Sequence, residues 1–209
     1  MSPSSDGVRA GASTFLAGPR VALRPLEAED APHLGRWMND DVTTYFMFTG
    51  QRPLTRAQVA EELARLVGSP ANSVFLVVER KSGQPIGFAG LYDINASARK
   101  AEFRILLGEA AYRGRGYGTE VTELLTFYGF DRLNLNRIWL GVTDDNLGAR
   151  RAYEKAGYRY EGTLRQDLYR NSRYYDSVRM SVLRDEYYNE RYKADAARFA
   201  SRAAEGVQA

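Results

Sequence analysis

Three glycines lie within five positions at residues 114–118, in the run Arg-Gly-Arg-Gly-Tyr-Gly that begins at Arg113. A β-rich stretch, residues 101–107, precedes this run. An amphipathic helix pattern follows from about Tyr117 to Asp131, with apolar residues at Val121, Leu124, Leu125 and Tyr128. Glycines adopt positive φ at little cost, and the first turn of a helix offers free N–H groups and the positive end of its dipole. The sequence therefore predicts a strand–loop–helix unit that holds a phosphate or pyrophosphate.

The two most common phosphate-binding loops do not fit this segment. A P-loop ends in Gly-Lys-Ser/Thr, whereas Gly118 is followed by Thr119 and Glu120. A dinucleotide-binding fingerprint that began at Gly114 would need a third glycine at position 119, which is threonine. Taken by itself, the segment also leaves open a flexible turn with solvated arginines.

The remaining patterns indicate one α/β domain without internal repeats. Residues 1–18, rich in Ser, Gly and Ala, are expected to form a flexible leader, and residues 189–209 a charged tail that is compatible with a helix. Residues 40–53 are expected to be a loop with the aromatic side chains Tyr45, Phe46 and Phe48. Strands are predicted at residues 21–26, 73–79, 86–94, 101–107, 137–142, 158–168 and 174–183, and helices at 27–39, from Thr55, at 117–131 and at 146–156.

The composition of the chain limits the kinds of site and partner that it can have. The chain has no cysteine and one histidine, His33, so we expect no disulfide, no thiolate nucleophile and no metal site. The formal net charge of +3 suits an anionic small molecule and is too small to indicate a nucleic-acid partner, which is not expected. The sequence shows no secretory signal and no apolar run of membrane-spanning length, which predicts a cytoplasmic protein without a membrane partner.

A second motif follows the glycine-rich segment. Residues 146–158 read Asn-Leu-Gly-Ala-Arg-Arg-Ala-Tyr-Glu-Lys-Ala-Gly-Tyr. Together with Arg-x-x-Gly-x-Gly after a strand, this run resembles the GCN5-related N-acetyltransferase (GNAT) superfamily. Leu23-Arg-Pro-Leu-Glu-Ala-Glu-Asp30 and Trp37-Met-Asn-Asp40 are similar to its RimJ/RimL-type branch. The resemblance covers roughly residues 20–188.

This resemblance implies the GNAT fold, of the α/β (α+β) class, over residues 19–188. A mixed, mostly antiparallel sheet of about six to seven strands is expected, flanked by about four helices. Acetyl-CoA would lie where the strands at 101–107 and 137–142 splay apart. Main-chain groups near Ile105, Leu106 and Leu107 would pair with the pantetheine, and Asn146 would hydrogen-bond it unless it serves only as a helix cap. The pyrophosphate would rest on Arg113, Gly114, Arg115, Gly116, Tyr117, Gly118 and Thr119.

Acetyl transfer needs a neutral amine and a proton for the departing thiolate. Because a primary amine has a pKa of about 10.4, a base is required near neutral pH, directly or through water. The resemblance implies Tyr153 as the proton donor and Glu102 as the base. Asp93, Tyr92 and water are the alternatives to Glu102, and Glu102 could instead pair with Arg104.

The acceptor is open. The RimJ/RimL-type branch implies a protein N-terminal amine, and Tyr45, Phe46 and Phe48 would suit an apolar or ring-shaped small amine such as an amino sugar or antibiotic. A polyamine ranks lower because residues 42–60 contain no carboxylate. An acyl group longer than acetyl, a homodimer through the last strands, and an acetyl-CoA-binding module without catalysis all remain open.

Overall fold

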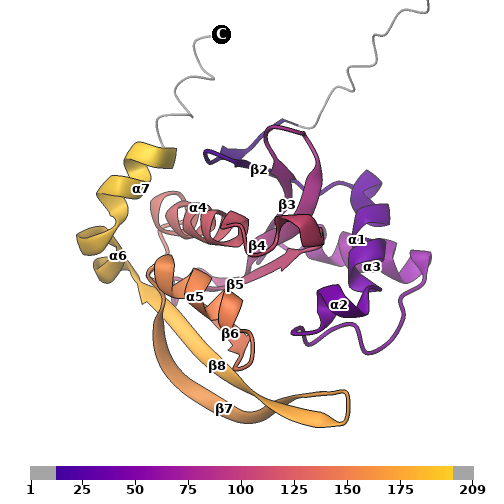
Figure 1. Cartoon of the computed structure of the whole chain (residues 1–209). Helices are drawn as coiled ribbons and strands as arrows, with labels where there is room; N and C mark the ends of the chain where they lie inside the picture. Colours follow the sequence, from indigo (N-terminus) through magenta and orange to yellow (C-terminus); the bar gives the residue numbers. More distant parts are fainter. Residues whose placement is uncertain (1–12, 200–209) are drawn as a thin grey trace, which may run out of the picture.

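The chain is described by a computed structural model from residue 13 to residue 199. Its centre is one mixed sheet of eight strands in the order β1-β2-β3-β4-β5-β6-β8-β7 (Figure 1). All neighbouring strands are antiparallel except β5 and β6, which are parallel. The strands are β1 Leu16–Ala17, β2 Val21–Pro25, β3 Ser73–Glu79, β4 Pro85–Asn95, β5 Lys100–Leu107, β6 Arg137–Thr143, β7 Arg159–Arg170 and β8 Arg173–Leu183.

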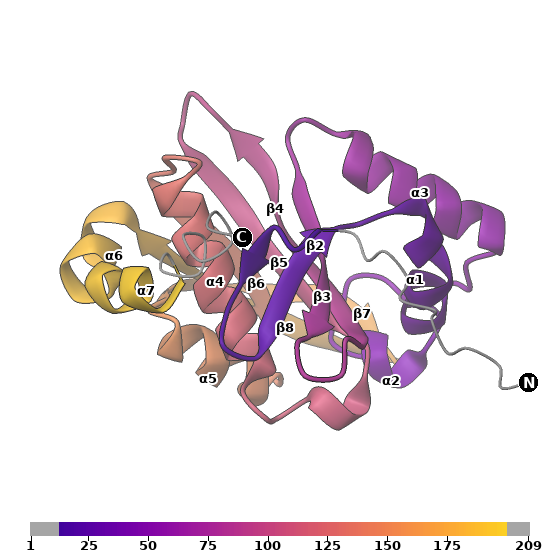
Figure 2. The ribbon, with the colours of Figure 1, turned by 90° about the horizontal axis from the view of Figure 1, so that it is seen from above.

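Helices cover the sheet in two groups, one on each side of it (Figure 2). The first group precedes β3 and packs on β3 and β4, and the second lies between β5 and β7 and after β8. The first group consists of the 3-10 turn η1 Ala28–Asp30, α1 Ala31–Met38, α2 Asp41–Thr44 and α3 Arg56–Gly68. The second consists of η2 Ala110–Tyr112, α4 Tyr117–Asp131, α5 Leu147–Lys155, α6 Arg184–Glu190 and α7 Tyr192–Phe199.

Two hydrophobic clusters follow from this arrangement, and they identify which way each strand residue points. Side chains alternate between the faces of a strand, so the odd residues Ala101 and Phe103 of β5 join the cluster under α4. The even residue Leu106 joins the cluster under α1 and α3. In β6 the alternation places Ile138, Leu140 and Val142 under α4.

The one parallel pair of strands opens after three residue pairs. β5 and β6 pair at Lys100 with Arg137, Ala101 with Ile138 and Glu102 with Trp139, and the described strands do not pair further. β5 remains paired to β4 as far as Leu107, and β6 remains paired to β8 as far as Thr143. We call the unpaired stretch, residues 103–107 of β5 and 140–143 of β6, the splay.

The structure confirms the predicted fold class and corrects several details. The sheet has eight strands, one of them only two residues long, and the described residues form seven α-helices instead of about four. The helix Tyr117–Asp131 is confirmed, and so is the helix predicted from Thr55, which has Thr55 as its N-cap in a capping box with Gln58. None of the described helices is long and apolar enough to cross a membrane.

Two segments that were predicted to be irregular are more ordered than expected, and the described part of the tail is helical, as its sequence allowed. Leu16 of the predicted leader is buried and pairs with Leu23 of β2, because an apolar side chain next to a sheet edge gains by covering it. Within the predicted loop at residues 40–53, Asp40 accepts a hydrogen bond from Thr43 N at 2.7 Å and begins α2. The tail forms α7, and Arg198 bonds to Glu123 of α4 at 2.5 Å. The other leader and tail positions, residues 1–12 and 200–209, lie outside the described residues.

Candidate active site

The glycine-rich segment forms a loop between the end of β5 and the first turn of α4. Gly114 has φ 68° and Gly116 has φ 84°, so both occupy the left-handed region in which glycine is favoured. A Cβ atom at Gly114 would meet no described atom within 4 Å, so the space above this position is open. Gly118 lies against Leu107, since its Cβ would be 3.5 Å from Leu107 Cδ1. The first amides of α4 therefore lie at the open end of the splay.

The two arginines of the loop, both predicted to lie at the pyrophosphate, each donate hydrogen bonds to main-chain carbonyl groups of the protein. Arg113 turns back to β5: its Nε donates to Leu107 O at 2.9 Å and its Nη2 to Gly108 O at 3.1 Å. Arg115 Nη1 donates to Ala111 O at 3.2 Å. Because carbonyl groups at a strand end lack ladder partners, a guanidinium that satisfies them stabilises the loop.

An ion pair between the buried Glu120 and the exposed Arg20 supports the loop. Glu120, in the first turn of α4, accepts hydrogen bonds from Arg20 N at 2.7 Å and Arg20 Nε at 2.8 Å. Arg20 in turn donates to Arg115 O at 2.9 Å and lies over the Tyr117 ring. This support could not be predicted from the sequence, because Arg20 is nearly a hundred positions away from the loop.

The strands that border the splay present unpaired main-chain groups. Gly108 N donates to Ile86 O, and hydrogen-bonded pairs alternate along an antiparallel ladder. By this alternation Leu106 directs its main-chain groups towards β4, and Ile105 directs its groups towards β6. The same reasoning from Asp144 N and Asp176 O directs Gly141 of β6 towards β5. The main-chain groups of Ile105 and Gly141 therefore face the splay. Those of Leu106, which was predicted to pair with pantetheine, face β4 instead.

Asn146 and Tyr153 lie on the side of the sheet that carries α4 and α5. Asn146 caps α5, and its Oδ1 accepts a hydrogen bond from Ala149 N at 3.1 Å. Its amide group donates to none of the described residues. Tyr153 packs edge-on against Phe103, at the start of the splay, with ring centroids 6.0 Å apart.

The Tyr153 hydroxyl is chemically distinct from that of its neighbour. Tyr158 donates or accepts a hydrogen bond with Thr126 at 3.0 Å, whereas the Tyr153 hydroxyl has no hydrogen-bond partner among the described residues. Burial raises the pKa of Tyr153 well above its ordinary value of 10.0. The phenol therefore keeps its proton throughout the neutral range and is free to donate it.

Glu102 lies on the opposite face of the sheet from Tyr153. It is an even residue of β5, and its Oε2 accepts a hydrogen bond from Arg104 Nη2 at 2.5 Å. The same Arg104 atom bonds to Asp93 Oδ2 at 3.1 Å, and its guanidinium stacks on the Tyr92 ring. The alternative pairing of Glu102 with Arg104 is thus present. Glu102 Oε1 has no partner among the described residues, so one carboxylate oxygen is still available to a ligand.

The alternative bases are less well placed. Tyr92 is buried beside Glu102 in the ladder, and burial raises its pKa far above 10.0, so that its phenol stays protonated. The Asp93 side chain is 73% exposed, and it begins a bulge with φ 52°.

The predicted aromatic loop bridges the open end of the splay. Thr43 Oγ1 accepts a hydrogen bond from Arg113 Nη2 at 2.7 Å on the β5 side. Three residues later, Phe46 O accepts one from Thr143 Oγ1 at 3.1 Å at the end of β6. Tyr45 bonds through its hydroxyl to Tyr175 of β8 at 2.9 Å, and Arg170 of β7 donates to Thr44 O at 2.8 Å. Phe46 and Phe48 remain exposed at this edge.

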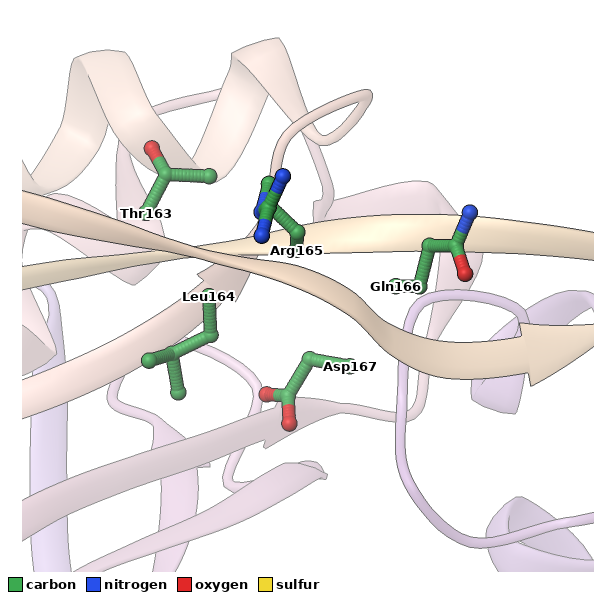
Figure 3. A pocket seen from close by; sticks show the side chains of 5 residues that line it. All are labelled: Thr163, Leu164, Arg165, Gln166 and Asp167. Atoms are coloured by element: carbon green, nitrogen blue, oxygen red, sulfur yellow. The ribbon is translucent and has the colours of Figure 1, made fainter.

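A depression of about 600 Å³ lies along the edge strand β7, away from the splay (Figure 3). It follows a bulge, because three residues of β7 lie between the pairs Leu164–Ser177 and Leu168–Tyr175, where β8 has only Asp176. Gln166 N donates to Asp176 Oδ1 at 2.8 Å within the bulge. The depression contains none of the predicted site residues, and within residues 13–199 no cluster of three potential ligand side chains could hold a metal ion.

These features define a transferase site: an anion-binding loop, a splayed sheet and a free phenol. The family model for the acetyltransferase (GNAT) domain matches residues 20–159, and the chain belongs to this family of N-acetyltransferases. Because the chain belongs to this family, the acetyl-CoA positions that the family resemblance implies apply to it. The role of each of these side chains in this chain is a proposal.

The chain is similar to bacterial spermidine N(1)-acetyltransferases. That of Vibrio cholerae is 35% identical over 171 residues, which cover 81% of this chain and 96% of the relative. That of Escherichia coli K12 is 29% identical and covers 81% of this chain and 89% of the relative. The solved structure of the Vibrio cholerae spermidine N-acetyltransferase in complex with CoA and spermine has a TM-score of 0.74 and 28% identity, covering 81% of this chain and 98% of the other.

Proposed function

We propose that the chain transfers the acetyl group of acetyl-CoA directly to a primary amine, with Tyr153 as the proton donor to the departing thiolate. The observation that carries this proposal is the free, protonated Tyr153 hydroxyl beside the splay. The cytoplasmic location and the likeness to the RimJ/RimL-type branch stay predictions.

The residues present fit acetyl-CoA. The open space above Gly114 and the free amides of α4 would receive the pyrophosphate, which carries negative charge. The main-chain groups of Ile105 and Gly141 would bond the pantetheine as an added strand does, and the amide of Asn146 has a donor to spare. Arg150 Nε is buried without a partner and lies one turn after Asn146, so this guanidinium would reach the same ligand.

The chemistry assigns one face of the sheet to each substrate. The thioester would lie on the Tyr153 face, and the amine would approach from the Glu102 face. Glu102 would take a proton from the ammonium form through Oε1 or through water, so that the neutral amine attacks the acetyl carbonyl carbon. A main-chain N–H that faces the splay, such as that of Ile105, would stabilise the developing oxyanion. The carbon–sulfur bond then breaks, and Tyr153 protonates the sulfur.

Two observations bear on the class of the acceptor amine, and they favour different acceptors. The relatives named for spermidine favour a polyamine. The charges of this chain favour a different amine, because residues 42–60 have no carboxylate and Arg104 forms ion pairs with both Glu102 and Asp93. A small amine or a protein N-terminal amine therefore remains our main proposal, and spermidine is the second candidate.

The test measures free thiol release from acetyl-CoA by the purified full chain with a panel of amines. The panel contains spermidine, amino sugars, amino acids and short peptides. We expect amine-dependent release, and Tyr153→Phe should lower kcat by about 100-fold while the KM for acetyl-CoA changes little. Tyr158→Phe is the matched control, because Tyr158 is equally buried but its hydroxyl is bonded to Thr126.

Two outcomes would contradict the proposal. CoA binding without turnover on any amine would favour a binding module. An equal loss of kcat in Tyr153→Phe and Tyr158→Phe, with equal loss of thermal stability, would assign Tyr153 a packing role only.

A further inference from the structure

The acceptor face of the sheet, which is the face of Glu102, has its charges largely paired. Its carboxylates are held by arginines at distances of 3.1 Å or less. The pairs are Glu102 and Asp93 with Arg104, Asp41 with Arg170, and Glu161 with Arg137. A polycation would have to displace these arginines, since a salt bridge satisfies a carboxylate that the ligand would need.

Arg179 differs from these arginines. Its guanidinium lies over the Trp139 ring at 4.6 Å and makes no ion pair or side-chain hydrogen bond with any described residue. It is only partly exposed, so its charge is partly removed from water. Asp167, an exposed carboxylate towards the tip of the hairpin, does not bond to it. Because a guanidinium carries five donors, Arg179 has unused capacity to bind an anion.

A second polar group lies beside it. Ser177, two residues before Arg179 on β8, is 1% exposed, and its Oγ has no hydrogen-bond partner. A Cβ atom on Gly141 would be 3.0 Å from Arg179 Nη1 and 3.4 Å from Ser177 Oγ. Both groups therefore converge above Gly141, where the absence of a side chain leaves the strand bare. A buried hydroxyl without a partner costs free energy, which a ligand oxygen would recover.

The register of the strands places this pair of groups beside the splay. Trp139 is the last β6 residue that pairs with β5, opposite Glu102, and Gly141 follows two residues later on the same face. Arg179 is the β8 partner of Gly141, and Ser177 is the partner of Thr143. An amine that reaches Glu102 would thus have its remaining atoms near Arg179. The helices α1 and α3 cover the sheet over β3 and β4, and the aromatic loop meets this face at Thr143, the β6 partner of Ser177. Gly141 and Arg179 remain partly exposed on it.

We propose that Arg179 and Ser177 form an anion subsite for the acceptor, so that the preferred substrate is an amine that carries a carboxylate group. The proposal rests on the proposed acetyl transfer and names its substrate class. Arg179 would bind the carboxylate through two parallel N–H donors, and Ser177 would donate its hydroxyl to the same group. The subsite would exclude a polyamine, because a second ammonium group would meet the Arg179 charge.

The test compares acceptors that differ only in the anionic group. Glycine, β-alanine and 4-aminobutyrate are each measured beside their carboxamides, and a peptide beginning Ser-Asp is measured beside one beginning Ser-Asn. The wild-type chain should favour the carboxylate of at least one pair by about tenfold in kcat/KM, which is the size of one charge-assisted hydrogen bond. A preference found only among the amino acids would indicate a free metabolite as the acceptor, and one found only among the peptides would indicate a protein N-terminus.

Variants connect the preference to the subsite. Arg179→Gln should abolish the preference by slowing the carboxylate acceptor and leaving the carboxamide unchanged, and Arg179→Lys should restore part of it. Ser177→Ala should weaken it by a few-fold. Arg165→Gln is the matched control: it removes the same charge from the same hairpin, but Arg165 points to the other side of β7 from Leu164, the β7 partner of Ser177 (Figure 3).

Binding provides a readout that does not depend on turnover. Calorimetry with the CoA-loaded chain would compare N-acetylglycine with N-acetylglycinamide. Tighter binding of N-acetylglycine that Arg179→Gln removes supports the subsite even if every amine proves inert, an outcome that contradicts only the acetyl transfer. Turnover with no carboxylate preference, or a spermidine rate that exceeds all others and is insensitive to Arg179→Gln, overturns the subsite and leaves the acetyl transfer standing.

Discussion

Glu102 of β5 and Tyr153 of α5 lie on opposite faces of the sheet, and both lie at the start of the splay between β5 and β6. Glu102 belongs to the last parallel pair, with Trp139, and Tyr153 packs on Phe103, the next residue of β5. In the mechanism we propose, the splay lets two side chains that a sheet would normally separate act on one reacting centre. The arrangement also separates the substrates, because the donor and the acceptor would reach that centre from different sides.

Replacing Glu102 by glutamine should lower kcat by about 100-fold with any accepted amine, because the variant cannot take a proton. The KM for acetyl-CoA should stay within about twofold, since Glu102 lies on the face opposite Tyr153. Steady-state kinetics with both substrates varied would measure this. Asp93→Asn is the control, since it alters the other carboxylate bound by Arg104. A similar loss in both variants would contradict Glu102 as the base.

Replacing Gly114 by alanine should weaken CoA binding by about tenfold or more. The new methyl group would occupy the open space in which the pyrophosphate is proposed to lie, and φ 68° is strained for alanine. Gly83→Ala is a matched control, because Gly83 has φ 70° and equally open surroundings in the hairpin of β3 and β4. Both variants should lose about 1 kcal/mol of stability. Calorimetric titration with CoA separates them, and equal affinities would argue against the loop as the pyrophosphate site.

Replacing Thr43 by valine should raise the KM for the amine about tenfold. The variant loses the hydrogen bond to Arg113 that ties the aromatic loop to the β5 side of the splay. Arg113 keeps its bonds to Leu107 O and Gly108 O, so the KM for acetyl-CoA should change little. Val42→Ala, at an exposed position of the same short helix, should behave like the wild type. A rise confined to the KM for acetyl-CoA would show that Thr43 serves the glycine loop instead.

Asp30 should make folding stability depend on pH below about 5. Burial by itself raises the pKa of Asp30, but hydrogen bonds from Arg24 and from Glu27 N outweigh it and hold the pKa below the ordinary 3.8. The folded state therefore binds fewer protons than the unfolded state in this range. The stabilisation is complete above the unfolded pKa and is lost as the pH falls through 3.8 towards the folded pKa.

Asp30→Asn should accordingly cost about 2 kcal/mol at pH 7, and less as the pH falls to 3. Urea unfolding at a series of pH values would measure both curves. Glu62→Gln breaks the exposed pair with Arg65 and should cost only about 0.5 kcal/mol. Parallel pH curves for the wild type and Asp30→Asn would show that Asp30 does not carry this dependence.

The local signals of the sequence located most of the elements and the loop. Periodicity identified α4 at Tyr117–Asp131 and β3 at Ser73–Glu79, because each buries a regular stripe of side chains that depends on its own residues. The capping residues Thr55 and Asn146 were also readable, since a cap bonds to an amide three residues away. The strands at 101–107 and 137–142 were predicted from their own residues, but that they splay apart was implied only by the resemblance to the family.

Contacts between distant residues were decided by the tertiary structure. Nothing near Arg113 in the sequence shows that its guanidinium satisfies the carbonyl groups at the end of β5 and the hydroxyl of Thr43 instead of facing the loop. In the same way, Arg179 reads as one arginine among many until the sheet places it over Gly141 beside a buried serine. The sequence by itself determined the strand–loop–helix unit and the free amides at the start of its helix, because these depend on backbone conformation over a few residues. The partner of each charged side chain, and hence which charge stays free for an acceptor, depends on which strands become neighbours, and only folding brings those together.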